Sequence, residues 1–388
     1  MGLDRAYLDH NSTSPLRPEV AELWSALLER GLGNPSSLHR SGREARHVID
    51  TAREQVAGAL GVGEEEITFT SGGTESNNLA LMGALEAMGE GTRLVATRTE
   101  HASVLEVLEQ AEGRGVDVAW IDVDEFGSLR MESLRSALAS TTGAVLVSVH
   151  IANNEVGTIQ PVGAVRADLE KSGLEYRLHV DAVQALGRIP LALSELGVDL
   201  ATFSAHKVGG PIGVGVLYRR KNTSIAPRSF GGGQELGLRP GTENAAMIGA
   251  AGLAIELAVR EQRELAERVE GLAHELWTDL STHLPGVRLL GHEWGSEHRL
   301  PNTLSVLLPG TDGKVLVTAL DLAGCEASAG SACASGSLEP SHVLIAMGLN
   351  SDEARAGLRL SLGWSTTRDE CQHTVDVLRK IAAASHAT

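Results

Sequence analysis

Short runs of β-branched and apolar residues alternate with amphipathic stretches from about residue 15 to residue 260. This alternation is typical of strands in a mostly parallel sheet that are joined by crossover helices. Between residues 45 and 60 the apolar side chains recur at helical spacing, and Gly61 is placed to end that helix. We therefore expect a doubly wound α/β fold here. The predicted strands are 67–70, 94–96, 144–150, 178–180, 200–203 and 214–218.

The pattern changes near residue 261. A long charged helix, from about 253 to 284, is predicted to lead out of the first unit, with Glu and Arg on one face. We expect a large domain over 1–261 and a smaller α+β domain over 262–388, against which the N-terminal segment packs. In the smaller domain the predicted strands are near 303–308 and 358–362, and the predicted helices are near 313–322, 342–348 and 368–384.

Composition narrows the class of protein. A chain of 388 residues is longer than one typical core supports, which agrees with two domains. Its 44 glycines and 42% apolar residues fit an α/β enzyme with many tight turns, and 3% aromatic residues leave little for stacking on bases. The formal charge of −17 repels nucleic acids and anionic lipid surfaces. We expect no nucleic-acid or membrane partner, although helix N-termini can still bind phosphate locally.

The three cysteines, Cys325, Cys333 and Cys371, form neither a CxxC pair nor a plausible disulfide framework. This usage favours a reducing compartment and predicts no metal site. The first ten residues contain no apolar signal region, and the longest apolar run, 245–255, is too short to span a membrane. We expect a cytoplasmic protein.

One lysine stands in a setting that suggests chemistry. The segment Ser204-Ala205-His206-Lys207 follows an apolar run and precedes a glycine-rich stretch from 208 to 215. A lysine amine condenses with a carbonyl only when neutral, and a strand end offers the desolvated position that this requires. The segment therefore suggests a site for a cofactor aldehyde, with Ser204 and His206 facing a phosphate. Taken alone, such a lysine is more often a solvated surface charge.

Further polar groups stand where strands end. Residues 67–78 have the pattern of a strand, a glycine turn and a helix start, which cradles phosphate through free N–H groups and the Thr74 hydroxyl. An ordinary capped turn is the alternative. Asn154 follows the strand 144–150, and Asp181 follows the strand 178–180, at the sheet edge where ligands bind. Asp181 could instead cap the next helix.

The order of these segments resembles the class V aminotransferase family of fold-type I enzymes that use pyridoxal 5′-phosphate (PLP), and within it the cysteine desulfurases of the NifS and IscS type. The resemblance covers nearly the whole chain, and the shared order of its motifs makes it specific. The motifs are Tyr7-Leu8-Asp9, Asn34-Pro35-Ser36-Ser37 with His39, Gly72 to Asn78, Glu100-His101, Asn153-Asn154-Glu155-Val156-Gly157, His179 to Gln184, Ser204 to Lys207, Gly231 to Glu235, Arg239 to Asn244, Ser331-Ala332-Cys333 and Arg359 to Gly363.

The resemblance implies a role for each candidate residue. Lys207 would hold PLP covalently and move the proton at the substrate's Cα. Asp181 would keep the pyridine nitrogen protonated, while Gln184 and Asn154 would hydrogen-bond the phenolic oxygen of the ring. His101 would stack on the ring and act as an acid–base group near the sulfur. The phosphate would be bound by Gly73, Thr74, Ser204 and His206.

The resemblance also implies roles outside the cofactor site. Thr242 would reach the phosphate of a neighbouring subunit, which implies a homodimer with shared active sites. Arg359 would anchor the substrate carboxylate through a bidentate contact, with Asn154 also contacting the substrate. Cys333, in a run of small residues suited to a mobile loop, would attack the substrate sulfur as a thiolate and carry a persulfide to an acceptor. Cys325 and Cys371 have no such context and receive no role.

Several positions depart from the family pattern. None of them removes a proposed chemical group, but fewer basic residues near the site entrance leave the identity of the acceptor open. The departures are Asn11-Ser12-Thr13-Ser14-Pro15 in place of Asn-Ala-Thr-Thr-Pro, Ile212 in place of lysine, and Leu236 and Trp364 in place of arginine.

The function that the resemblance implies is that of a PLP-dependent cysteine desulfurase. It would convert L-cysteine to L-alanine, form a persulfide on Cys333 and pass the sulfur to an iron–sulfur scaffold or a tRNA-thiolation relay protein. A selenocysteine lyase or an aminotransferase of the same fold is the nearest alternative, because fold alone does not determine the reaction. A non-catalytic sulfur-transfer scaffold is the alternative from another class, and the presence of Lys207, Asp181, His101 and Cys333 argues against it.

Overall fold

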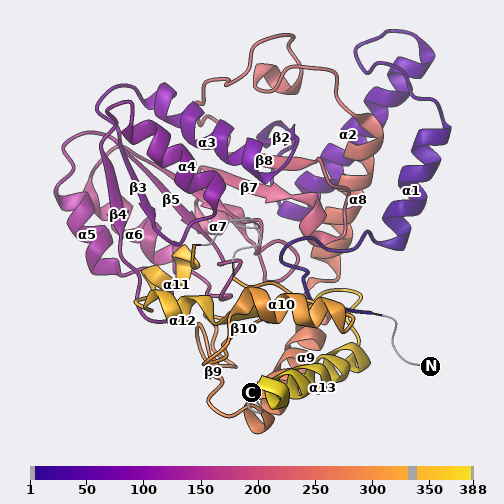
Figure 1. Ribbon diagram of the computed structural model, residues 1–388. Helices are drawn as coiled ribbons and strands as arrows, with labels where there is room; N and C mark the ends of the chain where they lie inside the picture. The colour runs from indigo at the N-terminus through magenta and orange to yellow at the C-terminus, as the bar shows by residue number, and fades with distance from the viewer. Residues whose placement is uncertain (1–4, 331–338, 386–388) are drawn as a thin grey trace.

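The computed structural model describes residues 5–330 and 339–385, so Cys333 lies outside the described residues. Within them, a seven-stranded sheet forms the centre of the larger part of the molecule (Figure 1). Its strands are β2 (Ile67–Thr70), β3 (Arg93–Thr97), β4 (Val118–Ile121), β5 (Val145–His150), β6 (Tyr176–Asp181), β7 (Leu200–Ser204) and β8 (Gly215–Arg219). Their order is β2-β8-β7-β6-β5-β3-β4; β8 is antiparallel to both its neighbours and the other pairs are parallel. The predicted mostly parallel sheet is confirmed.

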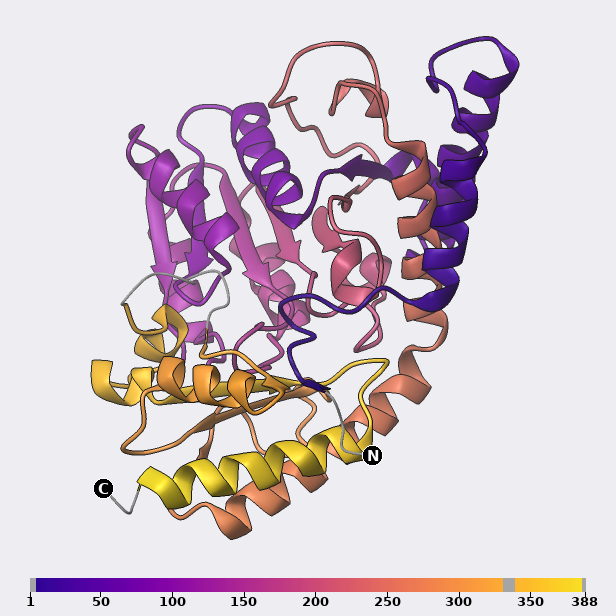
Figure 2. The ribbon, with the colours of Figure 1, turned by 45° about the vertical axis from the view of Figure 1, so that its right-hand side comes forward.

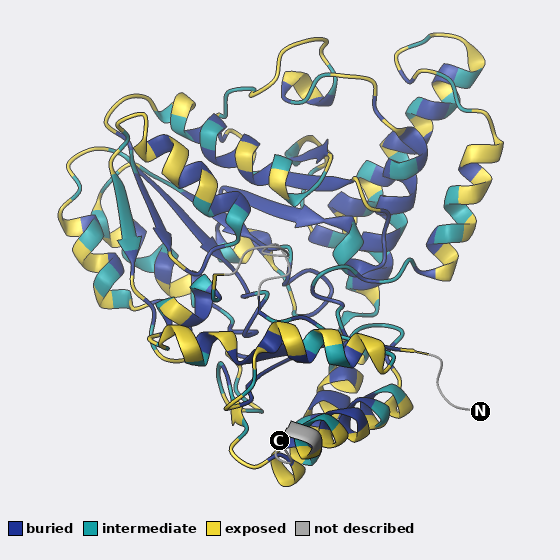
Figure 3. Cartoon of the chain, in the orientation of Figure 1, coloured by how far each residue is buried: buried dark blue, intermediate teal, exposed yellow. Residues whose placement is uncertain are grey.

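Helices cover both faces of this sheet because the strand side chains alternate between two buried layers. Leu94 and Leu146 pack in one layer with α3 (Gly73–Met88) and α4 (Ala102–Glu112). Val95 and Val147 belong to the opposite layer, whose helices are α2 (Arg40–Leu60), α5 (Met131–Ala139), α6 (Val162–Ser172) and α8 (Ala245–Arg260). Figure 3 shows most of the strands buried, the edge strand β4 partly so, and the outer faces of these helices exposed. The predicted doubly wound fold is therefore observed.

Shorter elements complete this part of the chain. Helix α1 (Pro18–Glu29) packs on α8, and α2 ends at Gly61, whose φ of 66° lies in the left-handed region that glycine adopts readily. The remaining short elements are α7 (Leu193–Leu196) and the 3₁₀ helices η1 (Glu64–Glu66), η2 (Ala205–Val208) and η3 (Glu235–Gly237).

A separate hydrophobic core lies below the large sheet in the view of Figure 1. Among the described residues it is built on a three-stranded antiparallel sheet of order β12-β10-β9 and on a parallel pair, β1 with β11. Ala6 and Leu8, from the N-terminal segment, are part of this core. Its elements are β1 (Ala6–Tyr7), β9 (Arg288–Leu289), β10 (Thr303–Leu307), β11 (Cys325–Glu326), β12 (Gly357–Ser361), α9 (Gln262–His283), α10 (Gly313–Leu322) and α13 (Arg368–Ser385). The short helices α11 (His342–Ala346) and α12 (Ser351–Arg355) belong to a neighbouring hydrophobic cluster, which Leu307 of β10 also joins.

The prediction of a single long helix from 253 to 284 is wrong. The structure has two helices, α8 and α9, which meet at Glu261. Helix α8 packs on α2 and α1, whereas α9 continues away from the large sheet and lies along α13 (Figure 2). The amphipathic pattern runs through both helices and does not mark the break. The two helices differ in what they pack against. The division into domains over 1–261 and 262–388 stays a prediction.

No helix within residues 5–330 and 339–385 is long and apolar enough to cross a membrane.

Candidate active site

A cavity of about 370 Å³ lies at the carboxyl ends of β5, β6 and β7. The last residue of each strand, His150, Asp181 and Ser204, lines it. Parallel strands place their carboxyl ends at one edge of the sheet, where ligands of open α/β folds bind. Of the predicted site residues that the structure describes, all except Thr242 line this cavity.

The N-terminus of α3 forms one wall of the cavity. Gly73 and Thr74, its first two residues, line the wall together with Ser204 and His206. The turn that precedes α3 contains Gly72, which lies against Gly215 of β8. Only glycine fits at position 215, because a Cβ atom there would lie 2.4 Å from the backbone of Gly72. The first N–H groups of a helix have no intrahelical acceptor and attract anions. The wall is therefore suited to a phosphate.

His206 is neutral near pH 7. Burial and, after it, the positive charges of Lys207 and Arg188 together lower its pKa to about 4. Its Nδ1 atom lies 3.0 Å from the Thr13 hydroxyl, which orients the ring. A neutral imidazole in this position can contribute a hydrogen bond to a phosphate without adding charge.

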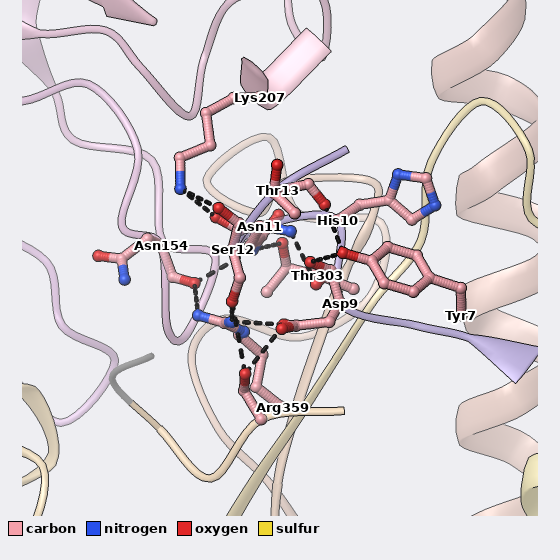
Figure 4. Close-up of polar contacts among 12 residues, drawn as sticks. Tyr7, Asp9, His10, Asn11, Ser12, Thr13, Asn154, Lys207, Thr303 and Arg359 are labelled. Atoms are coloured by element: carbon pink, nitrogen blue, oxygen red, sulfur yellow. Dashed lines mark hydrogen bonds and ion pairs between the residues drawn. The ribbon is translucent and has the colours of Figure 1, made fainter. Parts of the chain in front are cut away.

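Lys207 stands in η2, directly after β7. Its Nζ atom donates to the carbonyl oxygens of Asn11 and Ser12, at 2.9 and 2.5 Å. These two carbonyls belong to the N-terminal segment, whose Asn11 and Ser12 line the cavity, so the position of the amine depends on a segment far away in the sequence (Figure 4). The surface-lysine alternative is wrong, because Lys207 lines the cavity.

Asp181 is tied to His101 by a chain of hydrogen bonds. The Asn77 amide donates to Asp181 Oδ2 at 2.9 Å and to the Ser103 hydroxyl at 2.8 Å. The Ser103 hydroxyl lies 2.7 Å from His101 Nδ1, which also accepts from the Ser103 backbone N–H. Because Nδ1 is an acceptor, neutral His101 carries its ring proton on Nε2. Asp181 Oδ1 also accepts from the Val183 N–H, but the residues that follow form turns and not a helix, so the helix-cap alternative is wrong.

Gln184 and Asn154 are held by the N-terminal segment. Gln184 Nε2 donates to the Asn11 carbonyl at 3.0 Å, and the Asn11 amide donates to the Asn154 carbonyl at 3.1 Å. Gln184 Oε1 is buried and has no hydrogen-bond partner among the described residues. The Asn154 backbone, rather than its side chain, makes the contact with Arg359.

Arg359 is 1% exposed and lies at the cavity edge. Its Nη2 atom donates to Asp9 Oδ1 and to the Ser12 hydroxyl, both at 2.7 Å, and its Nη1 atom donates to the Asn154 carbonyl at 3.0 Å (Figure 4). The guanidinium is thus already ion-paired with a carboxylate of the chain itself. The surface-arginine alternative is wrong.

Among the described residues, one predicted site residue does not line the cavity. Thr242 is exposed, in the loop before α8. Cys333 lies outside the described residues. The other two cysteines are free thiols, and burial raises the pKa of both, that of Cys371 to about 12.

Sequence reasoning missed several residues of the cavity. Asn77, Ser103 and His150 line it without having been assigned a role. Burial opposes the charged form of His150, but the buried Glu100 carboxylate, 3.0 Å from Nδ1, outweighs this and raises its pKa. Asn77 lies within the phosphate-turn motif, and this motif was the signal in the sequence that could have identified it as a site residue. Ser103, two residues after His101, offered none.

The residues present fit PLP. Asp181 is 7% exposed and forms no ion pair in the part of the chain that the structure describes, so a buried carboxylate there is suited to a protonated ring nitrogen. The amine of Lys207 and the N-terminus of α3 line the same cavity and match an aldehyde and a phosphate. No group of three or more His, Cys, Asp or Glu side chains suited to a metal ion occurs among the described residues.

Comparison with known proteins agrees with this geometry. The chain is 43% identical, over 97% of its length and 94% of the relative's, to the cysteine desulfurase IscS of Dictyoglomus turgidum. It is 39% identical to that of Methanosarcina thermophila, over 97% of this chain and 91% of the relative. A solved structure described as a NifS-like protein superposes with a TM-score of 0.90 at 38% identity, covering 98% of this chain and all of the other. The NifS-like protein of Rickettsia africae gives 0.87 at 34% identity, covering 97% and 99%.

Fold and cavity together define the class: the protein is a PLP-dependent enzyme of fold type I. The chain belongs to the aminotransferase class-V family, whose model matches residues 6–373.

Proposed function

We propose that this protein is a cysteine desulfurase that converts L-cysteine to L-alanine and transfers the sulfur through a persulfide on Cys333. The supporting observation is where the chain is attached on either side of Cys333. Ser328 and Arg359 exchange backbone hydrogen bonds of 2.7 and 3.2 Å. His342 Nε2 lies 3.0 Å from the carbonyl oxygen of Glu100, next to His101. Both attachments are at residues beside the cavity, which supports a role for Cys333 there.

Each wall of the cavity has its own task in this proposal. Bound PLP supplies an electron sink for the substrate's Cα. The Asp181 carboxylate holds a proton on the ring nitrogen, and the N-terminus of α3 with Thr74, Ser204 and neutral His206 binds the phosphate. The Lys207 amine removes the proton from Cα. Arg359 binds the substrate carboxylate and thereby orients Cα toward the amine.

The sulfur step uses the Cys333 thiolate. Its Sγ attacks the substrate sulfur, and an S–S bond forms as the Cβ–S bond of the substrate breaks. Protonation at Cβ and Cα completes L-alanine, and His101 Nε2 is the proton carrier nearest this chemistry. L-cysteine plus a thiol gives L-alanine plus a persulfide, so no external oxidant is needed.

The proposal includes a homodimer with shared active sites. Thr242 is exposed and lies off the cavity, and the same loop carries Phe230, which is 86% exposed. A second copy that covers this loop would receive Thr242 at its phosphate site. The mass of one chain is 40.8 kDa, and light scattering is expected to give twice this value. The mass of a single chain would contradict the role of Thr242 at the phosphate site of a second copy.

An acceptor protein completes the proposed function, because the persulfide must be discharged before the next turnover. An iron–sulfur scaffold or a tRNA-thiolation relay protein has the chemistry to accept it. Cys325 and Cys371 are free thiols, which supports a reducing compartment such as the cytoplasm.

The test is an assay of L-alanine and sulfide from L-cysteine with PLP and a reductant. We expect equal amounts of both products from the wild type, none from Cys333→Ala, and unchanged turnover from Cys371→Ala, the matched control. Comparable turnover by Cys333→Ala would instead indicate a selenocysteine lyase or an aminotransferase. A protein that binds no added PLP would indicate the non-catalytic scaffold.

A further inference from the structure

Ser12 contacts both ends of the proposed substrate site. Its carbonyl oxygen accepts from Lys207 Nζ at 2.5 Å, and its hydroxyl oxygen accepts from Arg359 Nη2 at 2.7 Å (Figure 4). An α-amino acid carries its amine and its carboxylate on one carbon, so a residue between these two groups is next to the substrate. The family resemblance predicts alanine here, so the hydroxyl is a group that this chain adds.

The hydrogen bonds of Arg359 limit how it can receive a carboxylate. A guanidinium offers two edges of parallel N–H groups, Nε with Nη2 and Nη1 with Nη2. Both edges include Nη2, whose two hydrogens have acceptors in Asp9 Oδ1 and Ser12 Oγ. Nε is buried without a partner among the described residues. A bidentate carboxylate must therefore displace Asp9 or Ser12.

Of these two hydrogen bonds, the one between Arg359 and Ser12 is the easier to break. Asp9 is charged, and its Oδ1 atom is also held by the Ser328 hydroxyl at 2.9 Å. The Ser12 hydroxyl is neutral, and its other hydroxyl neighbour, Ser328 Oγ, is distant at 3.4 Å. A hydroxyl can rotate from accepting one hydrogen bond to donating another.

We propose that Ser12 is a specificity-determining residue of the substrate-carboxylate site. On substrate binding its hydroxyl releases Arg359 Nη2 and donates its proton to the same carboxylate that Arg359 receives. The carboxylate is then held by the guanidinium and by this O–H together. The inference rests on the proposed function only in requiring an α-amino acid as the substrate.

The test measures binding without turnover. The PLP-loaded enzyme is titrated with L-alanine and with L-alaninamide, which lacks the carboxylate, and the cofactor absorbance reports binding. Ser12→Ala is expected to weaken L-alanine binding about tenfold or more, as the loss of one hydrogen bond to a charged group does, and to leave alaninamide unchanged. The KM for L-cysteine is expected to rise by the same factor with little change in kcat. Ser12→Thr keeps the hydroxyl and is expected to restore both values.

Ser14→Ala is the matched control, because Ser14 lies in the same segment but bonds His10 at 2.7 Å, outside the cavity. Equal weakening of both ligands by Ser12→Ala would overturn the inference, since it would indicate only a structural role. Unchanged or tighter L-alanine binding would also overturn it. Ser12-dependent L-alanine binding in an enzyme that forms no sulfide from L-cysteine would keep this inference and refute the desulfurase.

Discussion

Asn77, near the start of α3, donates a hydrogen bond of 2.9 Å to the carboxylate of Asp181, at the end of β6. The same amide group reaches Ser103 and, through it, His101. The residue proposed to hold a proton on the ring nitrogen and the residue proposed to stack on the ring are thus oriented by one buried side chain. This arrangement gives Asn77 a positioning role that can be tested.

We expect Asn77→Ala to weaken PLP binding about tenfold, because Asp181 and Ser103 each lose a buried donor. The measurement is the PLP content after dialysis together with the cofactor absorbance maximum. Asn78→Ala is the matched control, since Asn78 is exposed and bonds the Thr74 carbonyl of its own helix. Equal PLP retention by Asn77→Ala and the wild type would refute the positioning role.

Acid is expected to destabilise the fold between pH 6.5 and pH 4. Burial lowers the pKa of His179 from 6.5 to about 4, so in this range the unfolded state binds more protons than the folded state. The contribution of His179 to the free energy of unfolding is fully present above pH 6.5 and is lost as the pH falls through 4. The loss is about 3 kcal/mol for this one group. His10 and His206 shift in the same direction.

Urea unfolding at pH 7.5, 6.0 and 5.0 measures this effect. His179→Gln should flatten the pH dependence, whereas a change at the exposed His283 to Gln should leave it as in the wild type. An unfolding free energy of the wild type that does not change between these pH values would contradict the prediction.

Arg53 is expected to stabilise the loop that leads to Thr242. It forms two hydrogen bonds with Glu235, of 2.6 and 3.1 Å, and the Glu235 side chain is 1% exposed. Arg53→Ala would leave a buried carboxylate unpaired, at a cost of about 3–5 kcal/mol in the free energy of unfolding.

The measurement is again urea unfolding, with Arg263→Ala as the control. Arg263 pairs with Glu267 on an exposed helix face, where such a pair contributes no more than about 0.5 kcal/mol. Similar losses of unfolding free energy in the two variants would show that the Arg53–Glu235 pair stabilises the protein no more than an exposed ion pair does.

Alkylation should distinguish the cysteines. Burial raises the pKa of the Cys325 and Cys371 thiols, so neither forms the reactive thiolate near neutral pH. We expect iodoacetamide at pH 7.5 to label Cys333 of the native protein well before the other two, with mass spectrometry of the peptides as the readout. Labelling of Cys371 as fast as Cys333 would argue against Cys333 as the nucleophile.

Local patterns predicted much of the secondary structure. The strand 67–70 matches β2 residue for residue, and the helix 313–322 matches α10, because each has an apolar period bounded by turn or capping residues. The edge strand β4 was missed, since Val118–Ile121 is half-buried over most of its length and has no run of β-branched residues. The break at Glu261 was missed because an amphipathic period does not record which surface a helix packs against.

The sequence by itself determined which chemical groups the chain carries, in what order, and at the ends of which strands. Lys207 and Asp181 could be chosen in this way because residue type and local period are properties of short segments, whereas Arg359 was chosen only through the resemblance to the family. Only the tertiary structure decided which polar groups meet. Ser12 and Arg359 are 347 residues apart, and Asn77 and Asp181 are 104 apart. Such contacts depend on how the N-terminal segment crosses the sheet edge and how α3 packs on it, and a hydrogen bond forms only when both packings bring donor and acceptor within about 3 Å.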